Sequence, residues 1–189
     1  MTAARRRLFF DECGALIAEF AVALPVLIVL LLAGFEISRY ALLHQKLDRL
    51  ATTMADLVAQ AETMTAEDID LLFLASEHVA WPFDIKTQGV VIVSSIRAAP
   101  TSPNDPPGPP VVVWQRSGGG TLTATSRIGV TSGQATLPAG LTVDKNDTII
   151  AAEVFFEFEP VFVPAIIPVS RLYHRAFYRP RLGALSTLG

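Results

Sequence analysis

The sequence predicts an α+β fold in which one N-terminal transmembrane helix extends into a long amphipathic helix that packs on a small antiparallel sheet. Three observations support this prediction: an apolar run, a heptad-spaced stripe directly after it, and alternating β-branched runs in the second half of the chain. We therefore expect a basic leader at 1–14, a transmembrane helix at 15–36, an amphipathic extension at 37–64 and an α+β domain at 65–189.

The apolar run accounts for much of the hydrophobic excess of this 189-residue chain, which is 51% hydrophobic and only 17% charged. Between Ala15 and Phe35, about 21 residues carry Glu19 as their sole ionisable group, which as a helix gives roughly 31 Å, enough for one bilayer crossing. A cleaved secretory signal peptide is the alternative. Its apolar core is usually shorter and ends in small residues, unlike the stretch that ends here at Glu36.

The orientation follows from the charges on either side of this run. Arg5, Arg6 and Arg7 precede it, whereas mixed charges follow it, so the positive-inside rule places the N-terminus in the cytoplasm. The chain from about Tyr40 onward is then expected in the periplasm or outside the cell.

The stripe after the apolar run has alternating steps of three and four residues, which is the spacing of a helical heptad. No turn signal appears before Thr65, so one helix is expected to continue to Met64. The stripe must be buried, either against the protein's own domain or against another subunit. Its central members are Leu43, Leu47, Leu50, Met54 and Leu57.

Beyond this helix the pattern predicts one short helix and four strands. A capping box formed by Thr65 and Asp68 begins the helix, which runs to about Val79 and is ended by Trp81-Pro82. Strands are expected at 90–96, 111–116, 148–158 and 169–178, the third of them half-buried and antiparallel. The proline-rich stretch 100–110 is expected to form an extended surface loop.

Enzymatic and nucleic-acid-binding classes find little support in the sequence. The net charge is −3 with scattered basic residues, and Cys13 is the only cysteine, so neither a nucleic-acid partner nor an intrachain disulfide is expected. His44, His78 and His174 lack metal-ligand spacing, and no nucleophile or phosphate-binding motif occurs. The glutamates of the third strand, Glu153 and Glu157, with Glu159 just beyond it, could bind a cation, but a solvated strand face is favoured. We expect no catalytic residue, no cofactor and no metal.

The stretch from Cys13 to Pro25 (CGALIAEFAVALP) is the most informative motif. A glycine at the membrane boundary, followed at the fifth residue by glutamate, resembles the processing site of type IV pilin-like proteins, which is cut after the glycine. The fuller pattern, with Glu-Phe-Ala and Leu-Pro, is similar to the TadE-like family of tight-adherence pili. The stretch from Arg171 to Arg181, which ends in Arg-Pro-Arg, resembles the C-terminal part of many family members.

This resemblance implies a pilin-like fold and a structural function: a minor pilin or pseudopilin in the inner membrane that takes part in assembling a tight-adherence, type IVc-like pilus. It implies processing between Gly14 and Ala15 and an assembly role for Glu19, Phe20 and Pro25. The implied partners are a prepilin peptidase, a related minor pilin, the major pilin and the inner-membrane assembly platform. The alternative is an uncleaved single-pass scaffold or periplasmic adaptor of the same machinery.

The physical chemistry of these residues is compatible with those roles. Glycine lets a protease approach the backbone closely, and cleavage would leave a new amine on Ala15. Glu19, one helical turn on, could neutralise that amine in its own or a neighbouring chain, or it could be a carboxylate that reaches the membrane interface. Pro25 removes one helical hydrogen bond and either bends the helix or is simply tolerated there.

Overall fold

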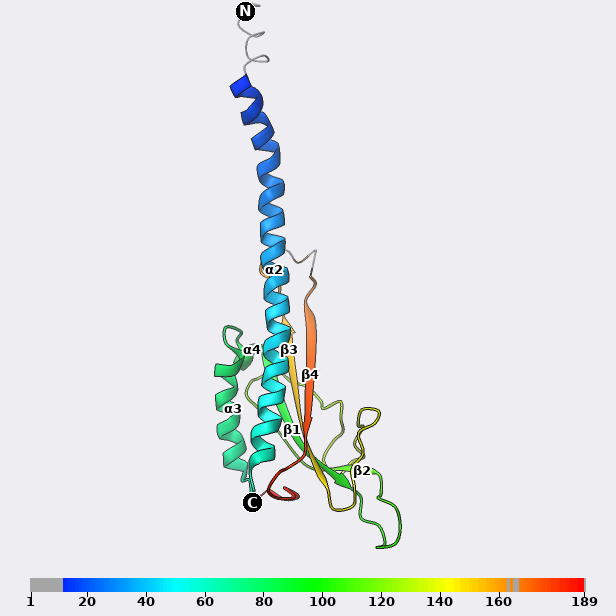
Figure 1. Cartoon of the computed structure of the whole chain (residues 1–189). Coiled ribbons are helices and arrows are strands. Elements are labelled where there is room, and N and C mark those ends of the chain that lie inside the picture. The colour runs from blue at the N-terminus through cyan, green and yellow to red at the C-terminus, as the bar shows by residue number, and fades with distance from the viewer. Residues whose placement is uncertain (1–11, 163, 165–166, 189) are drawn as a thin grey trace, which may run out of the picture. The chain divides into compact units, whose positions relative to one another are not determined.

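A computed structural model describes residues 12–162, 164 and 167–188 and shows a long N-terminal helix followed by two shorter helices and a four-stranded antiparallel sheet (Figure 1). The predicted α+β fold class is confirmed. Contacts within the chain form two compact units, unit 1 (Met1–Tyr40 and Glu159–Pro168) and unit 2 (Ala41–Phe158 and Val169–Gly189). Most of the predicted leader lies outside the described residues.

The long helix, α2 (Glu12–Gln60), contains both the apolar run and most of the heptad stripe. It ends at Gln60, four residues before the predicted end at Met64. The prediction was wrong there because Thr65, the N-cap of the next helix, is extended (φ −95°, ψ 166°) and the connection to it is not helical. A short connection of this kind is common between neighbouring helices.

Helix α3 (Ala66–Ala80) begins with the predicted capping box. The Asp68 amide donates to Thr65 Oγ1 over 3.2 Å, and the Thr65 amide donates to Asp68 Oδ2 over 3.0 Å. The Thr65 amide and, secondly, the Thr65 hydroxyl donate to the Asp68 carboxylate, which favours its charged form and holds the pKa of Asp68 below its ordinary value. After Trp81-Pro82, whose peptide bond is cis, a single turn α4 (Ile85–Gln88) leads into the sheet.

The sheet has the order β2-β1-β3-β4, and all three pairs of neighbouring strands are antiparallel. Its strands are β1 (Gly89–Ala98), β2 (Pro110–Gly118), β3 (Thr148–Phe158) and β4 (Ser170–Tyr178). All four predicted strands are confirmed, with ends that differ by up to two residues. The proline-rich stretch is the exposed connection between β1 and β2, also as predicted.

Both faces of the two central strands are covered, so the expectation that the third predicted strand is half-buried was wrong. On one face, Phe156 of β3 contacts Phe83 edge to face, and the buried residues of α2 from Leu43 to Ala59 belong to the same unit. On the other face, Ile128 and Ala135, from the irregular segment 121–147, pack with residues of β1, β2 and β3. An irregular segment has no hydrophobic period, which is why the sequence pattern did not indicate this cover.

Glu153 shows how that segment is attached to the sheet. It was expected on a solvated strand face, but its side chain is fully buried. Its carboxylate accepts hydrogen bonds from the Ser126 hydroxyl, from the Arg127 amide over 2.9 Å and from the Tyr173 hydroxyl over 2.9 Å. A buried carboxylate needs such donors, and only the tertiary structure supplies them. Burial and, secondly, the charge of Glu153 raise the pKa of the Tyr173 phenol.

Candidate functional site

The apolar part of α2 belongs to unit 1 and has almost no protein cover. The helix is long and apolar enough to cross a membrane, and its most apolar window is only 6% buried. The core helix of a water-soluble domain would be mostly buried, so this exposed apolar surface is compatible with a helix that anchors the chain in a membrane. Its exposed large side chains include Leu16, Ile17, Phe20, Val22, Leu24, Val26, Leu27, Ile28, Val29, Leu30 and Leu31.

The predicted processing and assembly residues all lie in this helix. Gly14 and Ala15 are in its first turns, where the structure describes the backbone but not their side chains. Glu19 is exposed among apolar neighbours, and Phe20 is 63% exposed. Helical structure continues through Pro25, so this proline does not break the helix. Glu19, Phe20 and Pro25 are thus displayed on an exposed helix surface rather than gathered in a pocket.

Glu36, at the end of the apolar run, makes contacts that the sequence did not suggest. Its side chain is fully buried in unit 1, and Oε2 accepts hydrogen bonds from the backbone amides of Val161 over 3.0 Å and Phe162 over 2.8 Å. Arg39 Nη1 lies 2.8 Å from Oε1. The rings of Phe35 and Phe162 meet edge to face with centroids 5.7 Å apart. One carboxylate therefore ties the β3–β4 loop to the end of the apolar helix.

The predicted stripe lies in the part of α2 that belongs to unit 2. Leu43, Leu47 and Leu50 are fully buried and Met54 is 2% exposed, whereas Leu57 is 40% exposed. Val58 is buried in its place. An α-helix has 3.6 residues per turn, so a strict seven-residue pattern drifts by about 20° per heptad and the buried face moves to the next residue. Within this chain, the stripe is buried against its own domain.

His44 of the same helix and His174 of β4, which show no relation in the sequence, lie next to each other. His44 Nδ1 lies 3.0 Å from His174 Nε2, and His174 Nδ1 lies 3.7 Å from Asp48 Oδ1. Burial, followed by the charge of His174, lowers the pKa of His44. Protonation of His44 therefore opposes folding. The free energy of unfolding is expected to fall as the pH falls from about 6.5, the ordinary pKa of histidine, toward this lowered pKa.

The C-terminal Arg-Pro-Arg motif also makes contacts within unit 2. Arg179 Nη1 lies 3.1 Å from Asp147 Oδ2, and Arg181 Nη2 lies 3.1 Å from Asp56 Oδ1 on α2. The Arg181 amide also donates to the Ala59 carbonyl over 2.9 Å. These contacts join the end of β4 to the segment before β3 and to α2, which gives the motif a role in closing the domain.

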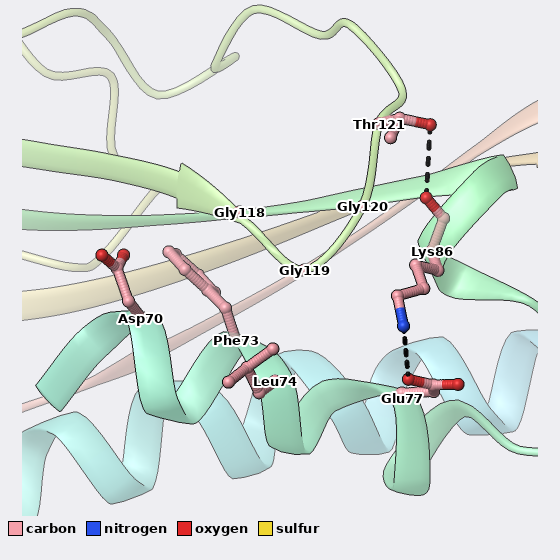
Figure 2. A pocket seen from close by; sticks show the side chains of 9 residues that line it. All are labelled: Asp70, Phe73, Leu74, Glu77, Lys86, Gly118, Gly119, Gly120 and Thr121. Carbon is pink, nitrogen blue, oxygen red and sulfur yellow. Dashed lines mark hydrogen bonds and ion pairs between the residues drawn. The ribbon is translucent and has the colours of Figure 1, made fainter. Parts of the chain in front are cut away.

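Unit 2 also contains an open cavity of about 340 Å³ between α3 and the end of β2 (Figure 2). Its polar lining includes an exposed ion pair, Lys86 Nζ to Glu77 Oε2 at 3.3 Å, together with Asp70 and Thr121. The glycines at its edge have a packing role, since a side chain at Gly118 would collide with the Phe73 ring and Gly119 has φ +78°. In the described part of the chain, no group of three or more His, Cys, Asp and Glu could hold a metal ion.

The comparison that bears on function concerns the helix rather than the cavity. Residues 14–56 match the family model described as TadE-like protein. The predicted TadE-like resemblance is thereby confirmed. No curated protein and no solved structure shows a significant match.

The TadE-like match begins at Gly14 and ends four residues before the end of α2. It therefore includes the predicted processing site, Glu19, the exposed apolar surface and most of the buried stripe. A TadE-like segment associates this chain with tight-adherence pili. The one helix among the described residues that is long and apolar enough to cross a membrane is compatible with single-pass membrane anchoring. The match covers less than half of the chain, and the sheet lies entirely outside it.

Proposed function

We propose that this chain is a minor pilin, or pseudopilin, of a tight-adherence pilus, anchored in the bacterial inner membrane by the apolar part of α2. The main support is the TadE-like match from Gly14 to residue 56, which falls on a helix whose apolar residues are exposed. In this proposal the N-terminus is cytoplasmic and unit 2 is periplasmic until the subunit enters a fibre.

The proposed processing step is hydrolysis of the peptide bond between Gly14 and Ala15 by a prepilin peptidase. Water adds across the bond, leaving a carboxylate on Gly14 and an amine on Ala15, which is protonated at neutral pH. Glu19 lies one helical turn beyond this amine and carries the opposite charge. Pairing the two, within one chain or between neighbours, would offset the cost of a lone carboxylate in lipid.

The proposed partners follow from this role. A related minor pilin, the major pilin and the inner-membrane assembly platform would contact the exposed apolar helix, since the stripe beyond it is already covered by the protein's own domain. The chain itself would act as a structural component and not as an enzyme.

The test is the intact mass of the membrane-extracted protein, produced in a host with the matching peptidase. We expect the wild-type chain to begin at Ala15 and the Gly14→Leu variant to accumulate at full length, because a bulky side chain excludes the peptidase from the backbone. Gly34→Leu is the matched control: it is the same exchange in the same helix, where an added Cβ meets nothing within 4 Å, and it should be processed normally.

If wild type and Gly14→Leu show the same full-length mass, the pilin proposal fails. The chain would then be an uncleaved single-pass scaffold or periplasmic adaptor of the same machinery.

A further inference from the structure

The loop between β3 and β4 is unusual in composition. Every residue from Pro160 to Val169 is apolar, in the order Pro-Val-Phe-Val-Pro-Ala-Ile-Ile-Pro-Val. Loops that face water are normally built from polar residues and glycine. Here Val161 is 61% exposed and Phe162 is 47% exposed. The exposed side chains of Val161 and Phe162 therefore suit a less polar environment than water.

The position of the loop relative to the membrane-anchoring helix is fixed within unit 1. The Glu36 carboxylate holds the amides of Val161 and Phe162, and the Phe162 ring contacts Phe35. Phe35 and Glu36 lie at the end of the apolar run, where the helix leaves the hydrocarbon layer in the proposed topology. The loop is consequently at the depth of the membrane interface.

The described start of the loop, from Pro160 to Phe162, is also suited to that depth. Backbone polar groups that face the acyl chains need hydrogen-bond partners within the protein, because water does not reach them there. Three prolines, Pro160, Pro164 and Pro168, have no amide hydrogen to satisfy. The amides of Val161 and Phe162 both donate to Glu36. This pairing also gives Glu36, a buried charge, the donors it requires, together with Arg39.

We propose that the β3–β4 loop is a second membrane contact, which inserts Val161 and Phe162 into the interfacial layer of the bilayer that α2 spans. The ligand is the lipid boundary between headgroups and acyl chains, where exposed apolar side chains are stabilised. A helix alone can rotate and tilt about its anchor, whereas a helix with a second contact beside it has a preferred orientation. The loop would thus set the orientation of unit 1 in the membrane. This inference rests on the membrane anchoring in the proposed function, but it does not depend on cleavage or on pilus assembly.

The test measures the depth of Val161 in the full chain, reconstituted in vesicles of phosphatidylethanolamine and phosphatidylglycerol. In a Cys13→Ser background, Val161→Cys is labelled with an environment-sensitive fluorophore, which leaves Phe162 in contact with Phe35. We expect quenching by lipids that carry a doxyl group near the headgroup, weaker quenching by lipids with the group deep in the acyl chain, and little quenching by aqueous iodide. Val26→Cys, 58% exposed near the middle of the apolar run, is the control for a deep position, and Leu74→Cys, 67% exposed on α3, is the control for an aqueous one.

A second variant tests the attachment by Glu36. Glu36→Gln keeps the shape but removes the charge from the acceptor, so hydrogen bonds to the loop weaken and lipid quenching at Val161 should fall toward the Leu74 value. Iodide quenching of the Val161 label at the Leu74 level in the parent chain would overturn the inference. Protection of that label from lipid quenchers and iodide alike would also overturn it, because the loop would then be covered by protein.

Vesicle flotation separates this inference from the proposed function. A chain that does not float with the vesicles contradicts the proposed anchoring and the loop contact together. A chain that floats, but whose Val161 label is exposed to water, contradicts the loop contact alone.

Discussion

Glu19 and Glu36 are two carboxylates on one helix with different environments. Glu36 is fully buried and accepts hydrogen bonds from two backbone amides and from Arg39. Glu19 is exposed among apolar side chains that we place in lipid. A carboxylate that accepts hydrogen bonds from groups of its own chain stabilises the fold. A carboxylate on an exposed apolar surface can instead pair with a positive group of another chain. We therefore propose an assembly role for Glu19, whereas the contacts of Glu36 are structural.

Replacing Glu19 tests the assembly role. Glu19→Ala makes the helix more apolar, so it should insert at least as well as the wild type. It should nonetheless reduce co-purification with the partner pilin and surface piliation, because the amine of Ala15 would lack its counter-charge. Glu19→Asp, which keeps the charge on a shorter side chain, should be intermediate. The measurement is membrane abundance beside partner recovery; an equal loss of both in Glu19→Ala would mean that the residue serves stability alone.

At the scale of elements, the two parts of α2 differ in their exposure. Its first part exposes apolar side chains on all sides, whereas its second part, which belongs to unit 2, buries one face within that unit. The change follows from the sequence, since the uninterrupted apolar run gives way to a pattern with polar residues on the other faces. The buried face follows the 3.6-residue period of the helix, which takes Leu57 out of the core and brings Val58 into it.

Two leucines of the stripe allow a matched comparison of stability. Leu50 is fully buried, so Leu50→Ala should lower the free energy of unfolding of unit 2 by about 2–5 kcal/mol. Leu57 is 40% exposed, and Leu57→Ala should cost about 1 kcal/mol or less. Denaturant unfolding of the detergent-solubilised full chain, followed by the fluorescence of Trp81 and Trp114, measures both. Equal losses for the two variants would contradict the burial that the structure assigns.

At the scale of the whole molecule, the proposed topology assigns each part of the chain to a compartment. Arg5, Arg6 and Arg7 remain in the cytoplasm because translocating them is unfavourable, and the apolar helix crosses once. Unit 2, which the structure shows with its own core and sheet, then lies outside the cytoplasm.

A reporter fused after Gly189 tests this topology. An enzyme that is active only in the periplasm should be active in the fusion, because a single crossing puts the two ends on opposite sides of the membrane. Replacing Arg5, Arg6 and Arg7 by alanine should lower that activity, as the bias that fixes the orientation is removed. Activity of a cytoplasm-only reporter at the same position, with none from the periplasmic one, would invert the proposed orientation.

The sequence by itself determined most elements of this protein and the placement of its apolar run, but not the single turn α4. Periodicity and capping depend on neighbours along the chain, so the capping box of Thr65 and Asp68, the four strands and the long apolar helix could all be predicted. The motif around Gly14 and Glu19 is likewise local, and the TadE-like match covers the same residues.

Only the tertiary structure decided which distant groups meet. Glu153 was predicted to be solvated because its donors, at Ser126 and Tyr173, are separated from it in sequence and come from an irregular segment and another strand. The pairing of His44 with His174 and the attachment of the β3–β4 loop to Glu36 have the same origin. Burial of a polar group is stable only with a partner, and that partner is brought close by the packing of helix, sheet and loop rather than by any spacing along the chain.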